Sequence, residues 1–109
     1  KGADLGIIVI ASYKPKPGKE KALDLLMEDH VKKLQNEGLV TNRPSITMKS
    51  QEGNIIEIFE WKSQKAIETA HSNPVVLKLW KDYAEVCEFT PLSKLIEASN
   101  LFAEFTSID

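Results

Sequence analysis

The first third of the chain consists of an apolar run followed by a helical stripe. Residues 5–13 are apolar on both parities, which is typical of a strand covered on both faces. In residues 19–37 the apolar positions recur at helical spacing, at Leu23, Leu26, Met27, His30 and Leu34. Gly18 can serve as the N-cap of this helix, and Gly38 can end it in a left-handed conformation. We therefore expect a strand followed by one helix.

The pattern then predicts two strands and a turn. Residues 41–50 and 55–62 are expected to be strands, because both are rich in β-formers. The turn falls at 52–54, where the sequence is Glu-Gly-Asn. In the second strand Ile55, Glu57, Phe59 and Trp61 share one face, since side chains alternate along a strand.

A second helical region follows and ends in a predicted strand. Ser63 is a good N-cap for a helix that reaches about His71. Asn73-Pro74 then begins another helix. Its apolar stripe contains Val76, Leu79, Trp80, Tyr83 and Cys87. Residues 90–100 are expected to be irregular or to form one helical turn, and residues 101–107, with Phe102 and Phe105, to form the last strand.

These elements follow one another in the order β-α-β, β-α-β. This order predicts an α+β fold of the ferredoxin-like βαββαβ type, with an antiparallel sheet and helices on one face. The expected strands are apolar on both parities, so a single copy would expose a wide apolar sheet face. We therefore expect a homodimer in which two sheets pack face to face.

Length and composition narrow the function further. The 109 residues predict a single domain, 1–109, with one core. The net charge of −2 comes without a basic stripe, which argues against a nucleic-acid partner. The lone Cys87 allows no intramolecular disulfide, so we expect a reducing, cytoplasmic setting. The longest apolar run, 7–11, is far too short to span a membrane. The chain begins with Lys1, which leaves open a leader upstream.

Three segments of the sequence resemble those of a known family. A strand-to-helix turn has the sequence Tyr-Lys-Pro-Lys-Pro-Gly-Lys-Glu (13–20), and the third expected strand has Glu-Ile-Phe-Glu-Trp-Lys-Ser (57–63). The broken second helix has Ala-Ile-Glu-Thr-Ala-His-Ser-Asn-Pro-Val-Val-Leu-Lys-Leu-Trp (66–80). In these segments the chain resembles the antibiotic biosynthesis monooxygenase-like superfamily. It is similar to a bacterial branch of that superfamily also at 38–44, 87–93 and 102–105.

The resemblance implies a dimeric α+β barrel with a pocket between the sheet and the helices. Members of the superfamily include cofactor-independent oxygenases of aromatic polyketides and haem-degrading oxygenases. The haem-degrading members use an Asn on the first strand, a Trp on the third and a His in the second helix. Trp61 matches the Trp, whereas Ala11 stands at the Asn position and Trp80 at the His position. These two replacements argue against haem degradation, and the loss of the Asn also weakens the oxygenase interpretation.

The two histidines are candidate catalytic bases. His30 lies on the apolar stripe of the first helix, where a neutral imidazole facing a pocket would act as a general base near neutral pH. The structural alternative is a core or interface histidine with one hydrogen bond. His71 precedes the helix break and would face inward or along the rim of the pocket. Its structural alternative is an interaction with the dipole at a helix end.

Three charged residues are candidate substrate contacts. Arg43, at a strand start, would bind a carboxylate or phenolate through two parallel hydrogen bonds. The alternative is an ion pair with Glu57, Glu60 or the partner subunit. Glu57 and Glu60 lie on opposite faces of one strand, so at least one should be half-buried, either as a base or in a salt bridge.

Large aromatic side chains are the remaining candidates. Phe59, Trp61, Trp80 and Tyr83 would line a pocket for a flat aromatic ligand, or else simply form the core. The two histidines lack the close spacing of a metal site, so no metal is predicted. The sequence contains no phosphate-binding loop and no Gly-x-Ser-x-Gly motif, and we predict no cofactor.

Two functional hypotheses follow. The first is a cofactor-independent, monooxygenase-like enzyme that acts on a small apolar or aromatic metabolite, with His30 or His71 as the base, Arg43 orienting the substrate and Trp61 forming a wall. The alternative is a non-catalytic small-ligand-binding or stress-related homodimer.

Overall fold

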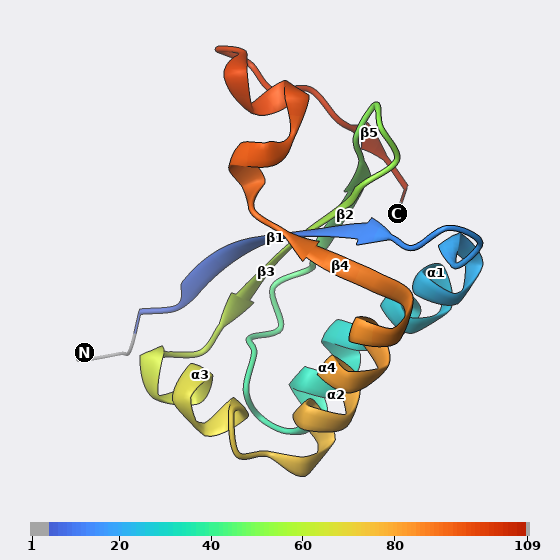
Figure 1. Ribbon diagram of the computed structural model, residues 1–109. Coiled ribbons are helices and arrows are strands. Elements are labelled where there is room, and N and C mark those ends of the chain that lie inside the picture. The colour runs from blue at the N-terminus through green and yellow to red at the C-terminus, as the bar shows by residue number, and fades with distance from the viewer. Residues whose placement is uncertain (1–4, 109) are drawn as a thin grey trace.

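The computed structural model describes residues 5–108 and shows an α+β fold built on one antiparallel sheet (Figure 1). The strands lie in the order β4-β1-β3-β2-β5. β1 (Ile7–Pro15) and β3 (Ile55–Trp61) pair along their length, with β2 (Ile46–Lys49) and β4 (Cys87–Thr90) on either side. The expectation of an α+β fold with an antiparallel sheet is confirmed.

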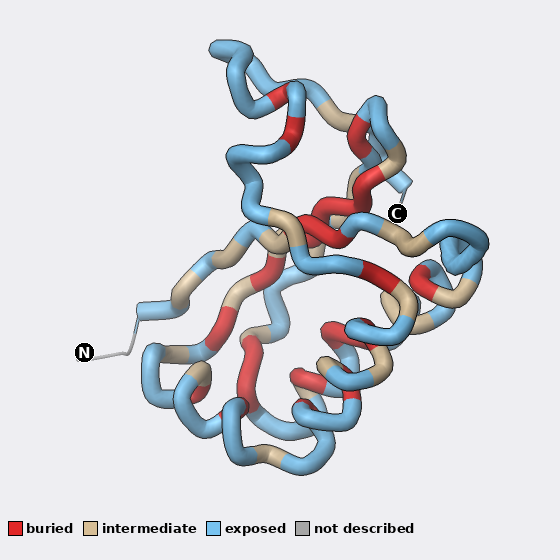
Figure 2. The backbone as a smooth tube through the Cα atoms, in the orientation of Figure 1, coloured by how far each residue is buried: buried red, intermediate tan, exposed pale blue. Residues whose placement is uncertain are grey.

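Four α-helices pack on one face of the sheet (Figure 1). They are α1 (Glu20–Glu28), α2 (His30–Asn36), α3 (Gln64–Ala70) and α4 (Pro74–Val86). The buried backbone follows the strands and the inner sides of these helices, so the core lies between the two layers (Figure 2). Within residues 5–108, no helix is long and apolar enough to cross a bilayer.

The predicted helix caps are present except at Gly18: α1 has Lys19 as its N-cap, and Gly18 lies in the preceding turn with a φ of +78°. The Ser63 hydroxyl accepts a hydrogen bond from the Ala66 amide at 3.1 Å and begins α3. The Asn73 side-chain oxygen accepts from the amides of Val75 and Val76 and begins α4. Gly38 has a φ of +73°, the left-handed conformation that glycine adopts at little cost. These local signals therefore locate α3 and α4 correctly.

The single helix expected over 19–37 is wrong in one respect, because it is two helices. Asp29 separates α1 from α2 with a φ of −125° and a ψ of 13°, outside the helical range. Asp is a weak helix former, since its side chain competes with the backbone for hydrogen bonds. As a result α2 begins at His30, whose ring reaches Glu57 on β3.

The strand at the end of α4 differs from the expectation. Cys87, expected on the helical stripe, begins β4, which pairs with the end of β1. No glycine or turn separates α4 from β4, so periodicity does not mark the boundary. The strand expected over 101–107 shrinks to β5 (Thr106–Ser107), and Phe102 is 78% exposed.

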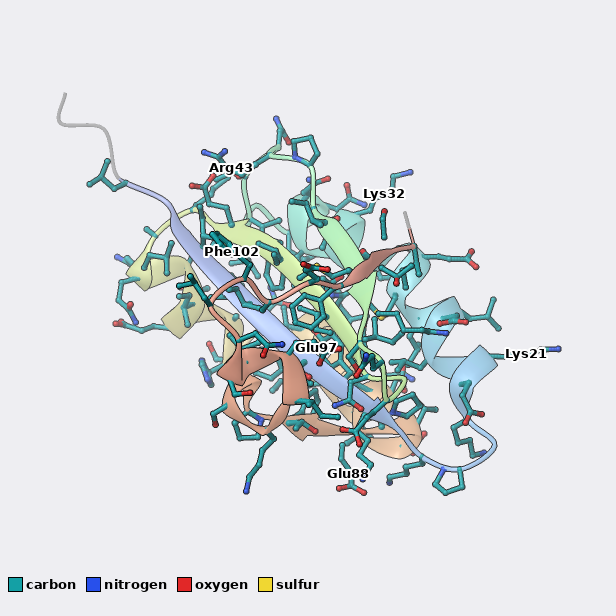
Figure 3. The ribbon with its side chains drawn as sticks, turned by 90° about the horizontal axis from the view of Figure 1, so that it is seen from above. Lys21, Lys32, Arg43, Glu88, Glu97 and Phe102 are labelled. Carbon is teal, nitrogen blue, oxygen red and sulfur yellow. The ribbon has the colours of Figure 1, made fainter. Side chains whose placement is uncertain are left out.

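The C-terminal segment, residues 91–105, lies on the side of the sheet away from the helices before the chain joins the sheet edge at β5 (Figures 1 and 3). It contains two short 3-10 turns, η1 (Leu92–Lys94) and η2 (Ile96–Ser99). Glu97 is buried, and its carboxylate accepts a hydrogen bond from the Gln51 amide at 2.8 Å. This contact attaches the segment to the turn between β2 and β3.

Part of this second sheet face is apolar and open. Ile10 on β1 and Ile46 on β2 both pair with Ile58 on β3, so their side chains lie on the same face. Ile8, Ile10 and Ile46 are about half-exposed. The expectation that strand 5–13 is covered on both faces therefore does not hold within a single chain.

Candidate functional site

A pocket of about 370 Å³ lies between the sheet and the helices. It is lined by Val9, Ala11, Tyr13, His30, Phe59, Trp61, Trp80, Tyr83 and Phe89. Six of these nine are Phe, Trp or Tyr, out of eight such residues in the chain. This size and apolar character are typical of sites for small molecules.

Strand alternation and helix periodicity bring these side chains together. Val9, Ala11 and Tyr13 are every second residue of β1 and therefore share its helix-facing side. Val9 pairs with Phe59 across the β1–β3 ladder, and Tyr13 pairs with Phe89 across the β1–β4 ladder. From the helical layer, Trp80 and Tyr83 of α4 are three residues apart and face the same way.

Six of the rings form a continuous series of contacts. Starting from Trp61, successive ring centroids lie 5.5 Å from Phe59, then 5.8 Å on to His30 and 4.9 Å on to Tyr83. The series continues with 5.0 Å from Tyr83 to Tyr13 and 5.9 Å from Tyr13 to Phe89. These distances lie within the range of favourable aromatic pairs. The ring wall therefore extends from β3 across α2 and α4 to β4.

A buried polar triad lies in this wall. The Tyr13 hydroxyl donates a hydrogen bond to Glu57 Oε1 at 3.0 Å. His30 Nδ1 lies 3.0 Å from the same oxygen. All three residues are at most 5% exposed. One carboxyl oxygen of Glu57 therefore contacts both the Tyr13 hydroxyl and the His30 ring.

This geometry favours one tautomer of His30. A proton on Nδ1 donates to Glu57, which leaves the lone pair of the neutral ring on Nε2. Among the described residues, none forms a hydrogen bond with Nε2. Because the His30 side chain lines the pocket, it has the chemistry of a base that a carboxylate orients from behind.

The two tyrosines are held in the neutral form. Burial, and after it the nearby charge of Glu57, raises the pKa of Tyr13 far above its ordinary value. The same two causes, in the same order, raise the pKa of Tyr83. Burial also raises the pKa of the Cys87 thiol to about 11, which makes this cysteine unreactive at neutral pH.

The structure brings most of the sequence candidates into this one place. His30, Trp61, Trp80 and Tyr83 line the pocket, and Glu57 lies directly behind His30. His71 does not line the pocket and is exposed, with its ring 5.2 Å from that of Trp80. Its Nδ1 lies 2.9 Å from the carbonyl oxygen of Ile67, a contact at the end of α3.

Arg43 and Glu60 lie elsewhere. Glu60 is on the opposite side of β3 from Glu57, as alternation requires. Its Oε1 accepts from Arg43 Nε at 3.0 Å and from the Thr41 hydroxyl at 2.8 Å. The hydrogen bond from Arg43, followed by that from Thr41, lowers the pKa of the Glu60 carboxyl. Figure 3 shows Arg43 at the edge of the molecule, so the ion-pair alternative describes this residue.

Two aromatic lining residues, Tyr13 and Phe89, are not among the sequence candidates. Tyr13 lies in the expected first strand, where it shares its parity with Val9 and Ala11. That parity, together with its polar end, is the signal that could have found it. Phe89 belongs to the strand that periodicity missed, so no sequence signal placed it at the pocket.

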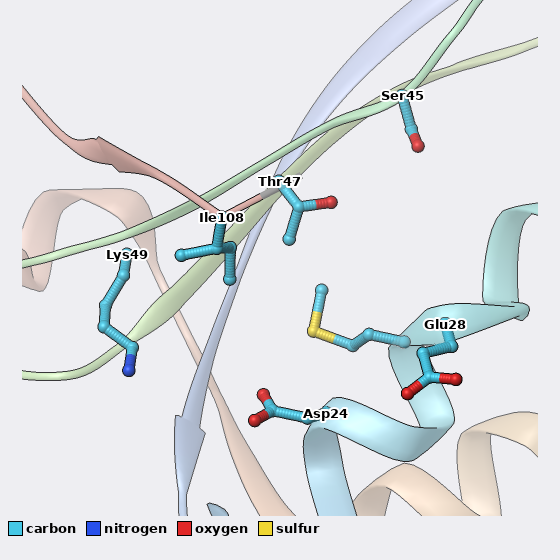
Figure 4. A pocket seen from close by; sticks show the side chains of 7 residues that line it. Asp24, Glu28, Ser45, Thr47, Lys49 and Ile108 are labelled. Atoms are coloured by element: carbon cyan, nitrogen blue, oxygen red, sulfur yellow. The ribbon is translucent and has the colours of Figure 1, made fainter. Parts of the chain in front are cut away.

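A second pocket, of about 490 Å³, lies between α1, β2 and the C-terminal end (Figure 4). Asp24 and Glu28 enter it from α1, and Thr47 and Lys49 from β2. Its lining is more polar than that of the aromatic pocket and contains none of the predicted candidates. In residues 5–108, no three His, Cys, Asp or Glu side chains gather closely enough to hold a metal ion.

Comparisons with known proteins add no further identification. No family model matches the chain, and no curated protein is significantly similar to it.

Proposed function

We propose that the chain binds a small, flat, largely apolar metabolite in the aromatic pocket and that His30 removes a proton from it. The observation that carries this proposal is the 3.0 Å contact between His30 Nδ1 and the buried Glu57 carboxylate, at the wall of an apolar pocket. This contact leaves Nε2 as the available base. Of the two candidate histidines, the proposal therefore assigns catalysis to His30.

The chemistry proposed is a cofactor-independent oxygenation that begins with this proton transfer. An acidic C–H or O–H proton of the substrate moves to Nε2, and Glu57 stabilises the imidazolium that forms. The substrate anion then reacts with dioxygen. For an anthrone, the methylene carbon exchanges its two hydrogens for one oxygen atom, and the second oxygen atom leaves as water with those hydrogens. The aromatic walls hold the ring system and exclude water.

The arrangement of the strands supports the ferredoxin-like βαββαβ plan that the sequence predicts. The order β4-β1-β3-β2, with each neighbouring pair antiparallel, is the order that this plan requires. The resemblance to the monooxygenase-like superfamily gains support from the pocket as well. Ala11, Trp61 and Trp80, the three positions compared with the haem-degrading members, all line it.

A second candidate function is ligand binding without catalysis. It is favoured by the same three positions, because Ala11 and Trp80 supply apolar surface where the haem-degrading members carry Asn and His. The side chains of Ala11 and Trp80 increase the apolar surface that a ligand can bury, but they provide no acid or base. In this case the triad of Tyr13, Glu57 and His30 would serve only to complete the buried wall.

We also propose that the working unit is a homodimer formed through the open sheet face. Ile8, Ile10 and Ile46 are each about half-exposed on that face. The chain exposes 7126 Å², about 1,000 Å² more than surface scaling gives for a folded monomer of its mass. A standard subunit interface buries about 800 Å² on each partner, so one such interface would account for most of the excess.

Oxygen uptake with anthrone- and quinol-type compounds tests the enzymatic proposal. The wild-type chain should consume oxygen above the uncatalysed rate, and His30→Ala should remove this activity. His71→Ala is the matched control, since it deletes the other histidine, outside the pocket, and should retain full activity. Equal rates for wild type and His30→Ala would eliminate His30 as the base. Binding of these compounds without any turnover would favour the second candidate function.

A further inference from the structure

The charge distribution around the aromatic pocket is one-sided. No lysine or arginine lines it within the part of the chain that the structure describes. Behind the lining, the carboxyl group of Glu57 contacts two lining residues, Tyr13 and His30, at 3.0 Å each. An ionised Glu57 behind a neutral His30 gives the pocket a negative potential, which burial keeps water from screening.

The aromatic rings that line the pocket also favour a positively charged ligand. Each aromatic ring has a negative face and a positive edge, so a ring that turns its face toward the cavity attracts a cation. Two lining residues are tryptophans, whose rings attract cations most strongly. Clusters of this kind are a recurrent way of binding quaternary ammonium groups.

We propose that the pocket binds a small organic cation, a molecule that carries a methylated ammonium group. The inference rests on the pocket of the proposed function but not on its proton-transfer chemistry. The cation is held by the faces of the ring wall, and the carboxylate of Glu57 behind that wall contributes its field without direct contact.

The degree of methylation follows from the hydrogen-bonding capacity of the lining. A primary ammonium group has three N–H donors, and burying them without acceptors costs free energy. The lining offers few acceptors: besides His30 Nε2, its only side-chain oxygens are the buried hydroxyls of Tyr13 and Tyr83. A quaternary or tertiary ammonium has no donors or only one, and its methyl groups match an apolar wall. The volume of about 370 Å³ admits a small molecule of this kind.

Binding of choline and of dimethylbutanol, in which a quaternary carbon replaces the nitrogen of choline, tests the inference. The two probes have the same shape and differ in charge. Isothermal titration calorimetry gives both affinities, and the fluorescence of Trp61 and Trp80, the only tryptophans, reports occupancy of the pocket. We expect choline to bind about tenfold more tightly. Equal affinities, tighter binding of dimethylbutanol, or no binding of choline would overturn the inference.

Two substitutions on one strand separate the field of Glu57 from general effects of charge. Glu57→Gln removes the carboxylate charge and keeps the shape of the side chain, so choline should lose its advantage while dimethylbutanol binds as before. Glu60→Gln is the matched control, because Glu60 lies on the opposite face of β3. It should leave the preference unchanged. If Glu57→Gln retained the full preference for choline, or if Glu60→Gln removed it, Glu57 would not be the source of the attraction.

A further variant keeps the inference testable if Glu57→Gln does not fold. Trp80→Leu removes one aromatic face from a half-buried side chain and leaves the triad in place. We expect it to reduce the ratio of the choline affinity to the dimethylbutanol affinity, and an unchanged ratio would contradict a role of the ring wall.

The experiments distinguish failure of this inference from failure of the enzymatic proposal. Without cation preference but with His30-dependent oxygen uptake, only this inference fails; with cation preference and no turnover, only the enzymatic proposal fails.

Discussion

The hydroxyl groups of Tyr13 and Tyr83 are in contrasting situations, although their rings stack at 5.0 Å. The Tyr13 hydroxyl donates to Glu57, a residue 44 positions away in the chain. The Tyr83 hydroxyl is buried and has no hydrogen-bond partner among the described residues. A buried polar group without a partner costs stability, whereas one bonded to a charged group adds to it. The same substitution should therefore have different effects at the two positions.

Tyr13→Phe should lower the free energy of unfolding by about 1.5–3 kcal/mol, because it removes a hydrogen bond to a charged group. Tyr83→Phe should leave stability unchanged or raise it, since it removes a hydroxyl without a partner. Urea denaturation followed by circular dichroism measures both values. An equal loss of stability in the two variants would contradict the assignment of the Tyr13–Glu57 hydrogen bond.

The same two tyrosines predict a pH dependence. Both have a raised pKa in the folded chain, whereas an unfolded tyrosine ionises near 10. Above this pH the unfolded state binds fewer protons than the folded state, so the stabilisation, fully present below it, is lost as pH rises. Tyrosinate absorbance should appear only together with loss of the helical circular dichroism signal. Absorbance that rises near pH 10 while the chain stays folded would contradict the burial of both phenols.

At the scale of elements, the start of α4 determines where Trp80 and Tyr83 point. Asn73 caps this helix through its side-chain oxygen, and its Nδ2 donates to Glu37 Oε1 at 3.1 Å. One side chain thus begins α4 and also links it to the end of α2, the helix that carries His30. The cap therefore holds the two helical sides of the pocket together.

Asn73→Ala should destabilise the fold by about 1 kcal/mol, the usual contribution of an N-cap. It should also weaken ligand binding at the pocket, because α4 carries two of the lining residues. Thermal unfolding and tryptophan fluorescence measure the two effects. Asn42→Ala, at an exposed position in the loop before β2, is the control and should change neither. Equal effects of both substitutions would show that the cap has no special role.

Elements with local signals could be predicted from the sequence, and the others could not. The caps at Ser63 and Asn73 act through adjacent amides, so the sequence around them is sufficient to locate α3 and α4. β4 is different, because its four residues depend on pairing with the end of β1, which is more than 70 positions earlier. Only tertiary contacts, which dominate in short strands, decide between helix and strand there.

The candidate site shows the same division. Helical spacing placed His30, Trp80 and Tyr83 on inward stripes, and the structure brings all three to the pocket. For Arg43 the sequence leaves both ligand binding and ion pairing open. The residues next to it in the chain indicate neither its ion-pair partner nor how exposed its long side chain is. The structure shows the pair with Glu60. Which face of β3 meets the helices likewise depends on the packing of the whole chain.

At the scale of the whole molecule, the surface is large for the mass. The radius of gyration is 14.3 Å, compared with about 13 Å for a typical globule of this length. The C-terminal segment contributes to this extended shape, because it lies beyond the sheet and exposes Leu101 at 91% and Phe102 at 78%. Together with the open isoleucines of the sheet, this surface favours association of two copies.

Light scattering at micromolar concentration should give twice the chain mass of 12.2 kDa. Ile10→Lys should shift the chain toward the monomer, since it places a charge in the middle of the proposed apolar interface. Leu25→Lys is the matched control, because Leu25 is an exposed apolar residue of α1, 66% accessible, on the other layer. A stable monomer of the wild-type chain, or equal effects of both substitutions, would contradict the proposed interface.

The central claim is that Glu57 holds the proton of His30 on Nδ1 and leaves Nε2 as a base in the pocket. Long-range proton–nitrogen correlation NMR of the two histidines tests this most directly, because it identifies the protonated nitrogen of each ring. In the neutral ring of His30 we predict a proton on Nδ1 and none on Nε2, with loss of this preference in Glu57→Gln. A neutral His30 with its proton on Nε2 would contradict the claim, since that nitrogen could not accept a proton from a ligand.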